Sequence, residues 1–289
     1  MKRVNIVLAL FVLAVVFSIK DTFAGPPFNN LEGVGGVAFN PLAYLADSGE
    51  ELIKIGDTDV LAKPRFGAWY VSLPDAKIDW TAFGVASTLF KRLEISYGYE
   101  NVAWETHPTF HKNNIGAKLL VLKENAFDTR FVPAFSIGTI YKNTSNKSLR
   151  DLPNGDRRSS GQDWYVVTTK TVNFLPVPVI LSGGVLSTQE YVTGVLGFSN
   201  KRKLTGFFNI DLVLPKGFVV GYEFKQGAQF STVKNANYWD AHVAWIPNKN
   251  LTLIAAYTAT GDYDKSVLQG TDTRTGLGNG FVVSAQYAF

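Results

Sequence analysis

The fold is decided by the nine residues FVVSAQYAF at positions 281–289. Every second residue of this stretch is apolar, and these residues are Phe281, Val283, Ala285, Tyr287 and Phe289. Successive side chains of a β-strand point to opposite faces, so the stretch predicts a strand with one continuous apolar face. About 9–11 residues suffice for a tilted strand to cross a bilayer. The stretch is therefore typical of a strand in a transmembrane barrel.

The same period-two alternation recurs along the chain from about residue 63 onward. In residues 93–100, LEISYGYE, apolar or aromatic side chains alternate with polar or small ones, and residues 238–245, YWDAHVAW, repeat the pattern. Strands are expected at 64–73, 79–90, 93–103, 113–122, 131–143, 163–174, 179–188, 203–214, 218–226, 237–246, 251–260 and 280–289. The sequence thus predicts an all-β fold, a transmembrane antiparallel up-and-down β-barrel of about 12 strands.

The connections between these runs support the same fold. Four of the connections are short enough to be tight turns: 91–92, 175–178, 215–217 and 247–250. Four others are long and polar, near 144–162, 189–202, 227–236 and 261–279. Short and long connections are expected to alternate, as they do in outer-membrane barrels with short periplasmic turns and longer external loops. Six tryptophans near expected strand ends favour interfacial aromatic girdles, namely Trp69, Trp80, Trp104, Trp164, Trp239 and Trp245.

The N-terminus has the pattern of a cleaved export signal. Lys2 and Arg3 precede an apolar run, residues 4–17, that is shorter than the ~20 residues of a spanning helix. Small residues, Thr22 and Ala24, follow at the positions that a signal peptidase reads. We therefore expect residues 1–24 to be a signal peptide and the protein to reside in the outer membrane of a Gram-negative bacterium.

This signal makes a direct prediction about the mature protein. Mass spectrometry of protein purified from the outer membrane should find Gly25 as the first residue, because cleavage after Ala24 fits the small-residue rule. An intact N-terminus would contradict the signal-peptide interpretation and favour an uncleaved anchor instead.

Composition excludes several function classes. The chain has no cysteine, which excludes disulfides, thiolate catalysis and thiolate metal sites. Charged residues make up 18% of the chain, below the ~25% of soluble domains. The signal carries three basic residues and one acidic residue, so the net charge of +4 falls to +2 on cleavage. So small a charge gives no argument for a nucleic-acid partner, and no cofactor is expected.

The domain organisation follows from these signals. Residues 63–289 are expected to form the barrel, and residues 25–62 an N-terminal extension. Within that extension, residues 31–46 contain three glycines followed by FNPLAYLAD, without the strand–glycine–helix arrangement of a dinucleotide site. The segment is too apolar for a free tail. A plug folded into the lumen is favoured over a periplasmic extension or an extra edge segment.

Two resemblances add to this interpretation. The alternate apolar residues ending in Phe289 resemble the C-terminal signal that the barrel-assembly machinery reads, which implies that machinery as a partner during biogenesis. Four longer stretches resemble a family of bacterial outer-membrane proteins of unknown function: 31–44 (LEGVGGVAFNPLAY), 72–100 (SLPDAKIDWTAFGVASTLFKRLEISYGYE), 115–122 (IGAKLLVL) and 239–257 (WDAHVAWIPNKNLTLIAAY). The resemblance implies fold and location, with no active site to carry over.

Candidate chemistry outside the lumen is sparse. His107 and His111 flank PTF in a stretch with too few convergent ligands for a metal. His242 lies on the expected inner face, as in a barrel hydrolase, with Ser182 or Ser284 as conceivable partners. No spacing ties either serine to His242, and no orienting group completes a triad. The sequence therefore predicts that the protein is not an enzyme.

Charges on the inner face carry the functional expectation. A charge facing lipid at midplane costs about 2–4 kcal/mol for Lys or Arg, so charged side chains within strands should point inward. The candidates are Glu94, Glu100, Lys118, Asp211, Glu223, Lys225, Asp240 and His242. The last five lie on three consecutive strands and are expected to form one patch. Either they line a narrow pathway for small solutes, or they form a salt-bridge network in a non-conducting barrel whose external loops bind a partner.

Overall fold

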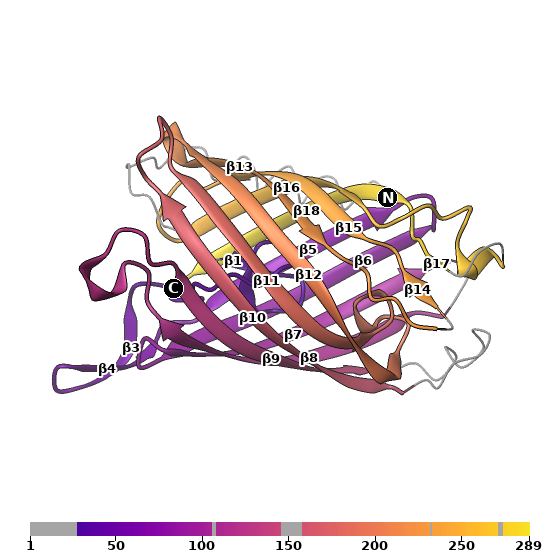
Figure 1. Cartoon of the computed structure of the whole chain (residues 1–289), viewed down its shortest axis with the longest axis horizontal. Coiled ribbons are helices and arrows are strands. Elements are labelled where there is room, and N and C mark those ends of the chain that lie inside the picture. Colours follow the sequence, from indigo (N-terminus) through magenta and orange to yellow (C-terminus); the bar gives the residue numbers. More distant parts are fainter. Residues whose placement is uncertain (1–27, 106–107, 146–157, 232, 271–273) are drawn as a thin grey trace.

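The computed structural model of this chain describes residues 28–105, 108–145, 158–231, 233–270 and 274–289. Long antiparallel strands dominate it (Figure 1). Twelve of them form the barrel wall: β5 (Arg65–Leu73), β6 (Ile78–Leu89), β7 (Leu93–Trp104), β8 (Phe110–Leu122), β9 (Ala134–Thr144), β10 (Ser160–Val172), β11 (Val179–Glu190), β12 (Phe198–Leu214), β13 (Phe218–Lys225), β15 (Tyr238–Trp245), β16 (Leu251–Ala259) and β18 (Asn279–Ala288).

The wall is closed because its last strand pairs with its first. Each wall strand is hydrogen-bonded to the next one along the chain, and β18 pairs with β5 over Phe281 opposite Ser72 to Ala288 opposite Arg65. Closure gives every wall strand two neighbours, which satisfies the backbone hydrogen bonds that lipid cannot. The predicted all-β, antiparallel up-and-down barrel of 12 strands is confirmed.

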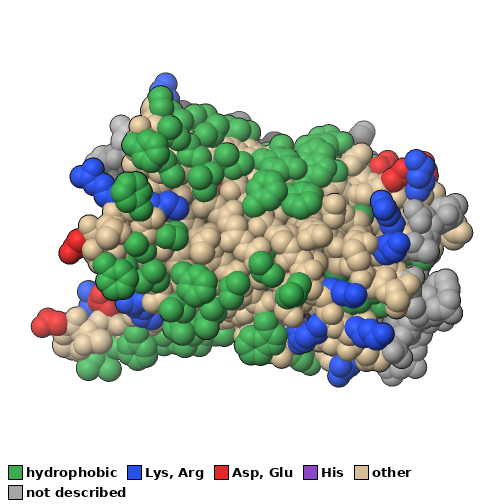
Figure 2. Space-filling view, in the orientation of Figure 1, with side chains coloured by type: hydrophobic (Ala, Val, Ile, Leu, Met, Phe, Trp, Pro, Cys, Tyr) green, Lys and Arg blue, Asp and Glu red, His purple; other side chains and the backbone are tan. Residues whose placement is uncertain are grey.

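The two faces of the wall differ in polarity as the alternation predicts. Large apolar side chains are exposed on the outside, among them Phe83 (58%) and Leu204 (73%), while most charged side chains of the wall strands are buried inside. Figure 2 shows apolar side chains spread over this face, with Lys and Arg gathered toward its two ends. So large an apolar surface is suited to lipid rather than to water.

The tryptophan prediction is half wrong. Trp164 is 52% exposed, and Trp239 and Trp245 also face outward. Trp69, Trp80 and Trp104, by contrast, are buried in the lumen. These three rings are buried because they occupy inward positions of their strands. Nearness to a strand end does not determine which side of the wall a side chain occupies.

An outward aromatic row nevertheless crosses the wall. Tyr222 stacks on Trp239 at 6.0 Å between ring centroids, Trp239 lies 6.0 Å from Tyr257, and Tyr257 meets Phe281 edge-on at 5.6 Å. These four rings come from β13, β15, β16 and β18. Such a row suits the interfacial zone of a bilayer, where aromatic girdles concentrate.

The barrel has a long-loop end and a short-turn end. The long-loop end carries 105–109, 145–159, 191–197, 226–237 and 260–278, and the short-turn end carries 90–92, 173–178, 215–217 and 246–250. Two connections break the predicted alternation: 74–77 is tight at the long-loop end, and 123–133 is long at the short-turn end. The longer connection lets Glu124 reach the interior, where it accepts hydrogen bonds from Tyr44 and Thr171.

The remaining elements are short. β3 (Glu51–Ile55) and β4 (Thr58–Ala62) form a hairpin that joins the wall sheet at β6, so part of the predicted extension belongs to this sheet. The others are β1 (Phe28–Asn29), β2 (Gly35–Gly36), β14 (Lys234–Asn235) and β17 (Arg274–Thr275), with 3-10 turns η1 (Ala126–Asp128), η3 (Val192–Gly194), η4 (Pro215–Gly217) and η5 (Val267–Gln269). Within the described ranges, no helix is long and apolar enough to cross a membrane.

Candidate functional site

Residues 28–46 lie inside the barrel and are named the lumen segment. All of its residues are buried except Phe39 and Tyr44, which are half-buried. β1 pairs with β2 within it, so the segment folds back on itself as a small hairpin. Residues 1–24, assigned above to the signal peptide, lie outside the described residues.

A glycine floor receives this hairpin. Gly67 faces Gly84 across β5 and β6, and Gly84 faces Gly98 across β6 and β7, which leaves an inner surface without side chains. A Cβ atom on Gly98 would lie 2.4 Å from the carbonyl oxygen of Glu32, and one on Gly84 would lie 2.7 Å from the Cα of Gly33. Only glycine lets the two backbones approach this closely.

An ion pair in the wall holds both arms of the lumen segment. Lys118 Nζ lies 3.0 Å from Glu94 Oε2 and donates to the carbonyl oxygens of residues 35, 42 and 44. Glu94 accepts from the backbone N–H groups of Gly35 (2.8 Å) and Ala46 (2.6 Å). Two opposite charges therefore bind main-chain donors and acceptors of one segment.

A second anchor lies on the opposite side of the lumen. Glu223 accepts hydrogen bonds from three consecutive backbone N–H groups, at Ala38 (2.8 Å), Phe39 (2.8 Å) and Asn40 (3.1 Å). Asn40 also donates to the side chain of Asn209. The carboxylate thus takes up the donors of a turn that has no strand partner, which satisfies buried groups that would otherwise be orphaned.

The histidine of the inner face belongs to a carboxylate pair. His242 Nε2 lies 2.8 Å from Asp211 Oδ1, and His242 Nδ1 lies 2.7 Å from Asp240 Oδ1. Both ring nitrogens are therefore bonded to carboxylates and not to a serine. The two serines raised as partners bond elsewhere: Ser182 to Thr169 (3.0 Å), and Ser284 to Gln286 (3.3 Å).

A larger charge network fills the lumen toward the long-loop end. Lys142 is fully buried and is paired with Asp163 (2.7 Å), Glu190 (2.5 Å) and Glu32 of the lumen segment. Glu190 also pairs with Lys225 (2.9 Å). Glu32 also pairs with Lys112, which in turn lies 2.8 Å from Glu100. Three lysines and four carboxylates thus compensate one another without contact with bulk water.

All eight charged residues expected to face inward are buried in the lumen. The expectation of one patch is wrong for Lys225, which pairs with Glu190 at the far end of β11 rather than with Asp211, Asp240 and His242. Alternation gives the face of a residue but not its height along the barrel, and Lys225 is the last residue of β13. The sequence reasoning missed four strand residues whose inward positions were the available signal: Lys112, Lys142, Asp163 and Glu190.

Two cavities border the lumen segment. One, of 30 Å³, lies beside Glu32, Phe39 and Tyr238, and is large enough for about one or two waters. The other, of 720 Å³, opens at the short-turn end beside Tyr44 and the 173–178 turn. The lumen segment occupies the space between these two cavities.

A surface ion cluster ties down the chain just after the lumen segment. Glu50 pairs with Lys63 at 2.7 Å and with Lys249 in the turn between β15 and β16. Hydrogen bonds from Lys249 and then Lys63 lower the pKa of this exposed carboxyl to about 2. Glu50 therefore keeps its negative charge at any physiological pH.

The candidate residues outside the lumen do not form a metal-binding site among the described residues. His107 lies outside the described residues, and His111 hydrogen-bonds the outward-facing Tyr99 (2.8 Å). Over the part of the chain that the structure describes, no group of three or more His, Cys, Asp or Glu side chains is arranged to hold a metal ion. Phe281, Val283, Tyr287 and Phe289 are exposed on the outer wall, and Ala285 shares their face. Their role in assembly stays a prediction.

Comparison with solved structures finds membrane barrels at low identity. "KdgM porin" is 12% identical, covers 78% of this chain and 99% of that chain, and has a TM-score of 0.49. Omp33 of Acinetobacter baumannii is 9% identical over 80% and 98%, with a TM-score of 0.43. Outer membrane phospholipase A from Escherichia coli is 10% identical over 84% and 97%, with a TM-score of 0.40.

Comparison with curated proteins gives no match. A protein-family model, described as "Protein of unknown function (DUF3034)", matches residues 26–272. The match includes the lumen segment and eleven of the twelve wall strands. This chain therefore belongs to the DUF3034 family.

Proposed function

We propose that this protein is an outer-membrane channel for small solutes that the lumen segment closes. The observation that supports it is that three charged side chains of the inner wall, Glu94, Lys118 and Glu223, all bind backbone atoms of the lumen segment. Main-chain contacts of this kind do not require particular side chains on the segment. Water can replace each of them when the segment leaves.

The polarity of the lumen favours reversible closure over a permanent filling. Burying charged groups brings a desolvation cost that their pairing only offsets, and apolar residues of similar volume are often as stable or more stable. A barrel that needed only a solid core would gain nothing from fully buried Lys118 and Glu223. A barrel that fills with water in its open state needs these side chains to line the pathway.

Conductance in planar bilayers tests this proposal. We expect the wild-type protein to be mostly closed, and Glu94→Gln/Glu223→Gln to raise the fraction of time open by at least about tenfold. The physical reason is that hydrogen bonds to a charged acceptor contribute about 1.5–3 kcal/mol and neutral ones about 0.5–1.5 kcal/mol. The matched control is Asp211→Asn, a lumen carboxylate that bonds His242 rather than the lumen segment.

A reversible lock separates this proposal from its rival. The chain has no cysteine, and Ser136 Oγ lies 2.6 Å from the carbonyl oxygen of Ala43, so Ala43→Cys/Ser136→Cys is the pair chosen to link the lumen segment to β9 by one disulfide. In the Glu94→Gln/Glu223→Gln background, oxidation should abolish conductance and reduction should restore it. Silence of every variant would favour the non-conducting interaction barrel, and conductance that ignores the lock would contradict closure by this segment.

A further inference from the structure

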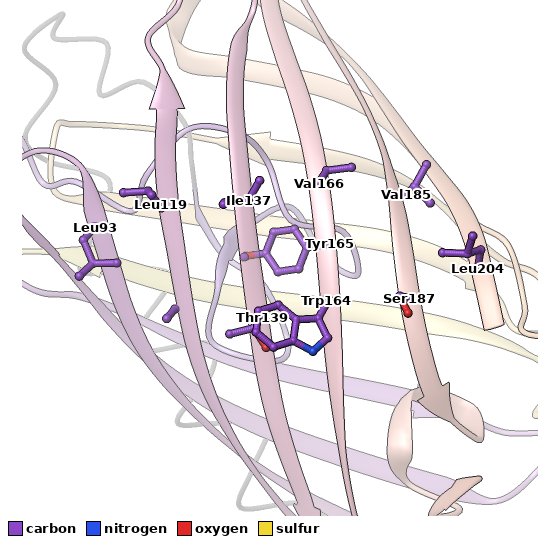
Figure 3. Close-up of a pocket in the computed structure, with 12 residues that line it drawn as sticks. Leu93, Leu119, Ile137, Thr139, Trp164, Tyr165, Val166, Val185, Ser187 and Leu204 are labelled. Carbon is purple, nitrogen blue, oxygen red and sulfur yellow. The ribbon is translucent and has the colours of Figure 1, made fainter. Parts of the chain in front are cut away.

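An apolar groove crosses the outer wall from β7 to β12. It has a volume of 390 Å³, within the about 300–1,000 Å³ of ligand pockets. Figure 3 shows its lining side chains, which extend across the strands from Leu93 to Leu204. Leu93 is the first residue of β7 at the short-turn end, whereas Leu204 lies in the half of β12 that starts at the long-loop end. The groove therefore runs obliquely through the zone that lipid covers.

Small outward residues hollow this part of the wall. Ala117, Thr139 and Ser187 lie on the outer face among larger neighbours such as Ile137 and Trp164. The small residues are on three different strands, so the depression is longer than one side chain. A straight acyl chain fits such a surface, because it fills a narrow apolar groove without needing a polar partner.

An exposed arginine, Arg202, lies at the end of the groove nearer the long loops. Arg202, two residues before Leu204, donates from one guanidinium nitrogen to the carbonyl oxygens of Gln162 (2.7 Å) and Ser187 (3.2 Å). Its strand neighbours Lys201 and Lys203 are also exposed, but alternation directs their side chains to the other face of β12. Among the described residues, no carboxylate forms a salt bridge with any of these three. A guanidinium has five N–H donors, so several remain for an anion.

We propose that the groove binds a phosphorylated lipid, with an acyl chain against Ile137 and Trp164 and a phosphate on Arg202. Long loops of such barrels face the outside, so the lipid belongs to the outer leaflet. The phosphorylated glycolipid of that leaflet, lipid A, has both required parts, acyl chains and phosphate. Arginine suits this role better than lysine, because its planar guanidinium can donate two parallel hydrogen bonds to one phosphate.

The other end of the groove offers an internal comparison. Arg92, next to Leu93, donates to the carbonyl oxygens of Leu120 (3.2 Å) and Val121 (3.4 Å) in the same manner as Arg202. It lies at the short-turn end, which faces the opposite leaflet in the orientation proposed above. The two arginines therefore allow an experiment to separate the two leaflets.

Native mass spectrometry of the folded, full-length mature protein tests the site, with lipid A added to the detergent micelles and phosphatidylcholine as competitor. We expect wild type to retain lipid A in preference to phosphatidylcholine. Arg202→Gln should lower the retained fraction by about tenfold, since it removes a charge-assisted bond to phosphate. Arg274→Gln, an exposed arginine of the long-loop end on β17, should not.

A second pair of variants tests the groove itself. Ala117→Phe fills the groove and leaves Arg202 in place, so it should also lower lipid A retention by about tenfold if the acyl chain contributes. Ala241→Phe, on the outer face of β15, is the matched control. Loss in Arg92→Gln instead of Arg202→Gln would overturn the assignment, as would equal retention of phosphatidylcholine. Unchanged retention in both Arg202→Gln and Ala117→Phe would overturn the site altogether.

Discussion

Gly98→Ala is expected to release the lumen segment from the barrel while the wall stays folded. The added Cβ would lie 2.4 Å from the carbonyl oxygen of Glu32 and 2.5 Å from its carbonyl carbon. These are backbone atoms, so no rotamer change relieves the clash. The floor strand β7 is fixed by pairing to β6 and β8, and the hairpin is the part that can move.

Hydrogen exchange read by mass spectrometry measures this release. The backbone N–H groups of residues 35, 38, 39, 40 and 46 are bound to Glu94 and Glu223, so peptides covering them should be protected in wild type. In Gly98→Ala they should exchange as fast as an unstructured chain, and peptides from β10 to β16 should stay protected.

Gly183→Ala is the matched control for this result. Gly183 also lies in a wall strand, but a Cβ there has one neighbour, the carbonyl oxygen of Phe207, at an ordinary 3.8 Å. We expect no change in the exchange of residues 28–46. Continued protection of this segment in Gly98→Ala would show that the floor does not determine its position.

Lys142→Met is expected to cause the largest loss of stability of any single substitution proposed. It leaves Glu32, Asp163 and Glu190 buried together without their shared cation. Removing one partner of a buried ion pair costs about 3–5 kcal/mol, and here three carboxylates lose one. We therefore expect the free energy of unfolding to fall by at least about 3 kcal/mol.

Urea unfolding followed by heat-modifiable gel mobility measures the change. Lys265→Met is the control, because its partner Asp262 is 3.5 Å away and both side chains are exposed, and surface pairs contribute about 0–1 kcal/mol. Adding Glu32→Gln to Lys142→Met should recover part of the loss, since it removes one of the unpaired charges. A Lys142→Met protein as stable as the control would mean that water reaches this network.

The sequence predicted the wall well because alternation is a local property. Each of the twelve expected runs overlaps a wall strand. β12 begins at Phe198, five residues before the expected start, because its polar residues 199–203 show no alternation. The β3–β4 hairpin was missed for a related reason: β3 is mostly exposed on both faces and β4 is mostly half-buried on both, so neither strand alternates.

The inner site was predictable only in part. Alternation assigned Glu94, Lys118 and Glu223 to the lumen, but nothing in the strands says that their partners are backbone atoms of residues 35–46. The glycine floor was equally hidden, since Gly67, Gly84 and Gly98 come together only when three strands take up their register. Contacts that depend on register and on height along the barrel cannot be obtained from a one-dimensional period.

The position of the lumen segment in the chain determines when it can become ordered. It precedes every wall strand, yet Ala38 binds Glu223 across 185 residues and Asn29 binds Gln286 across 257 residues. Contacts of such long sequence separation form only after the intervening loop has closed, which slows folding. The first part of this segment to leave the ribosome is therefore the last to find its partners. Until β18 pairs with β5, its binding surface does not exist as one concave wall.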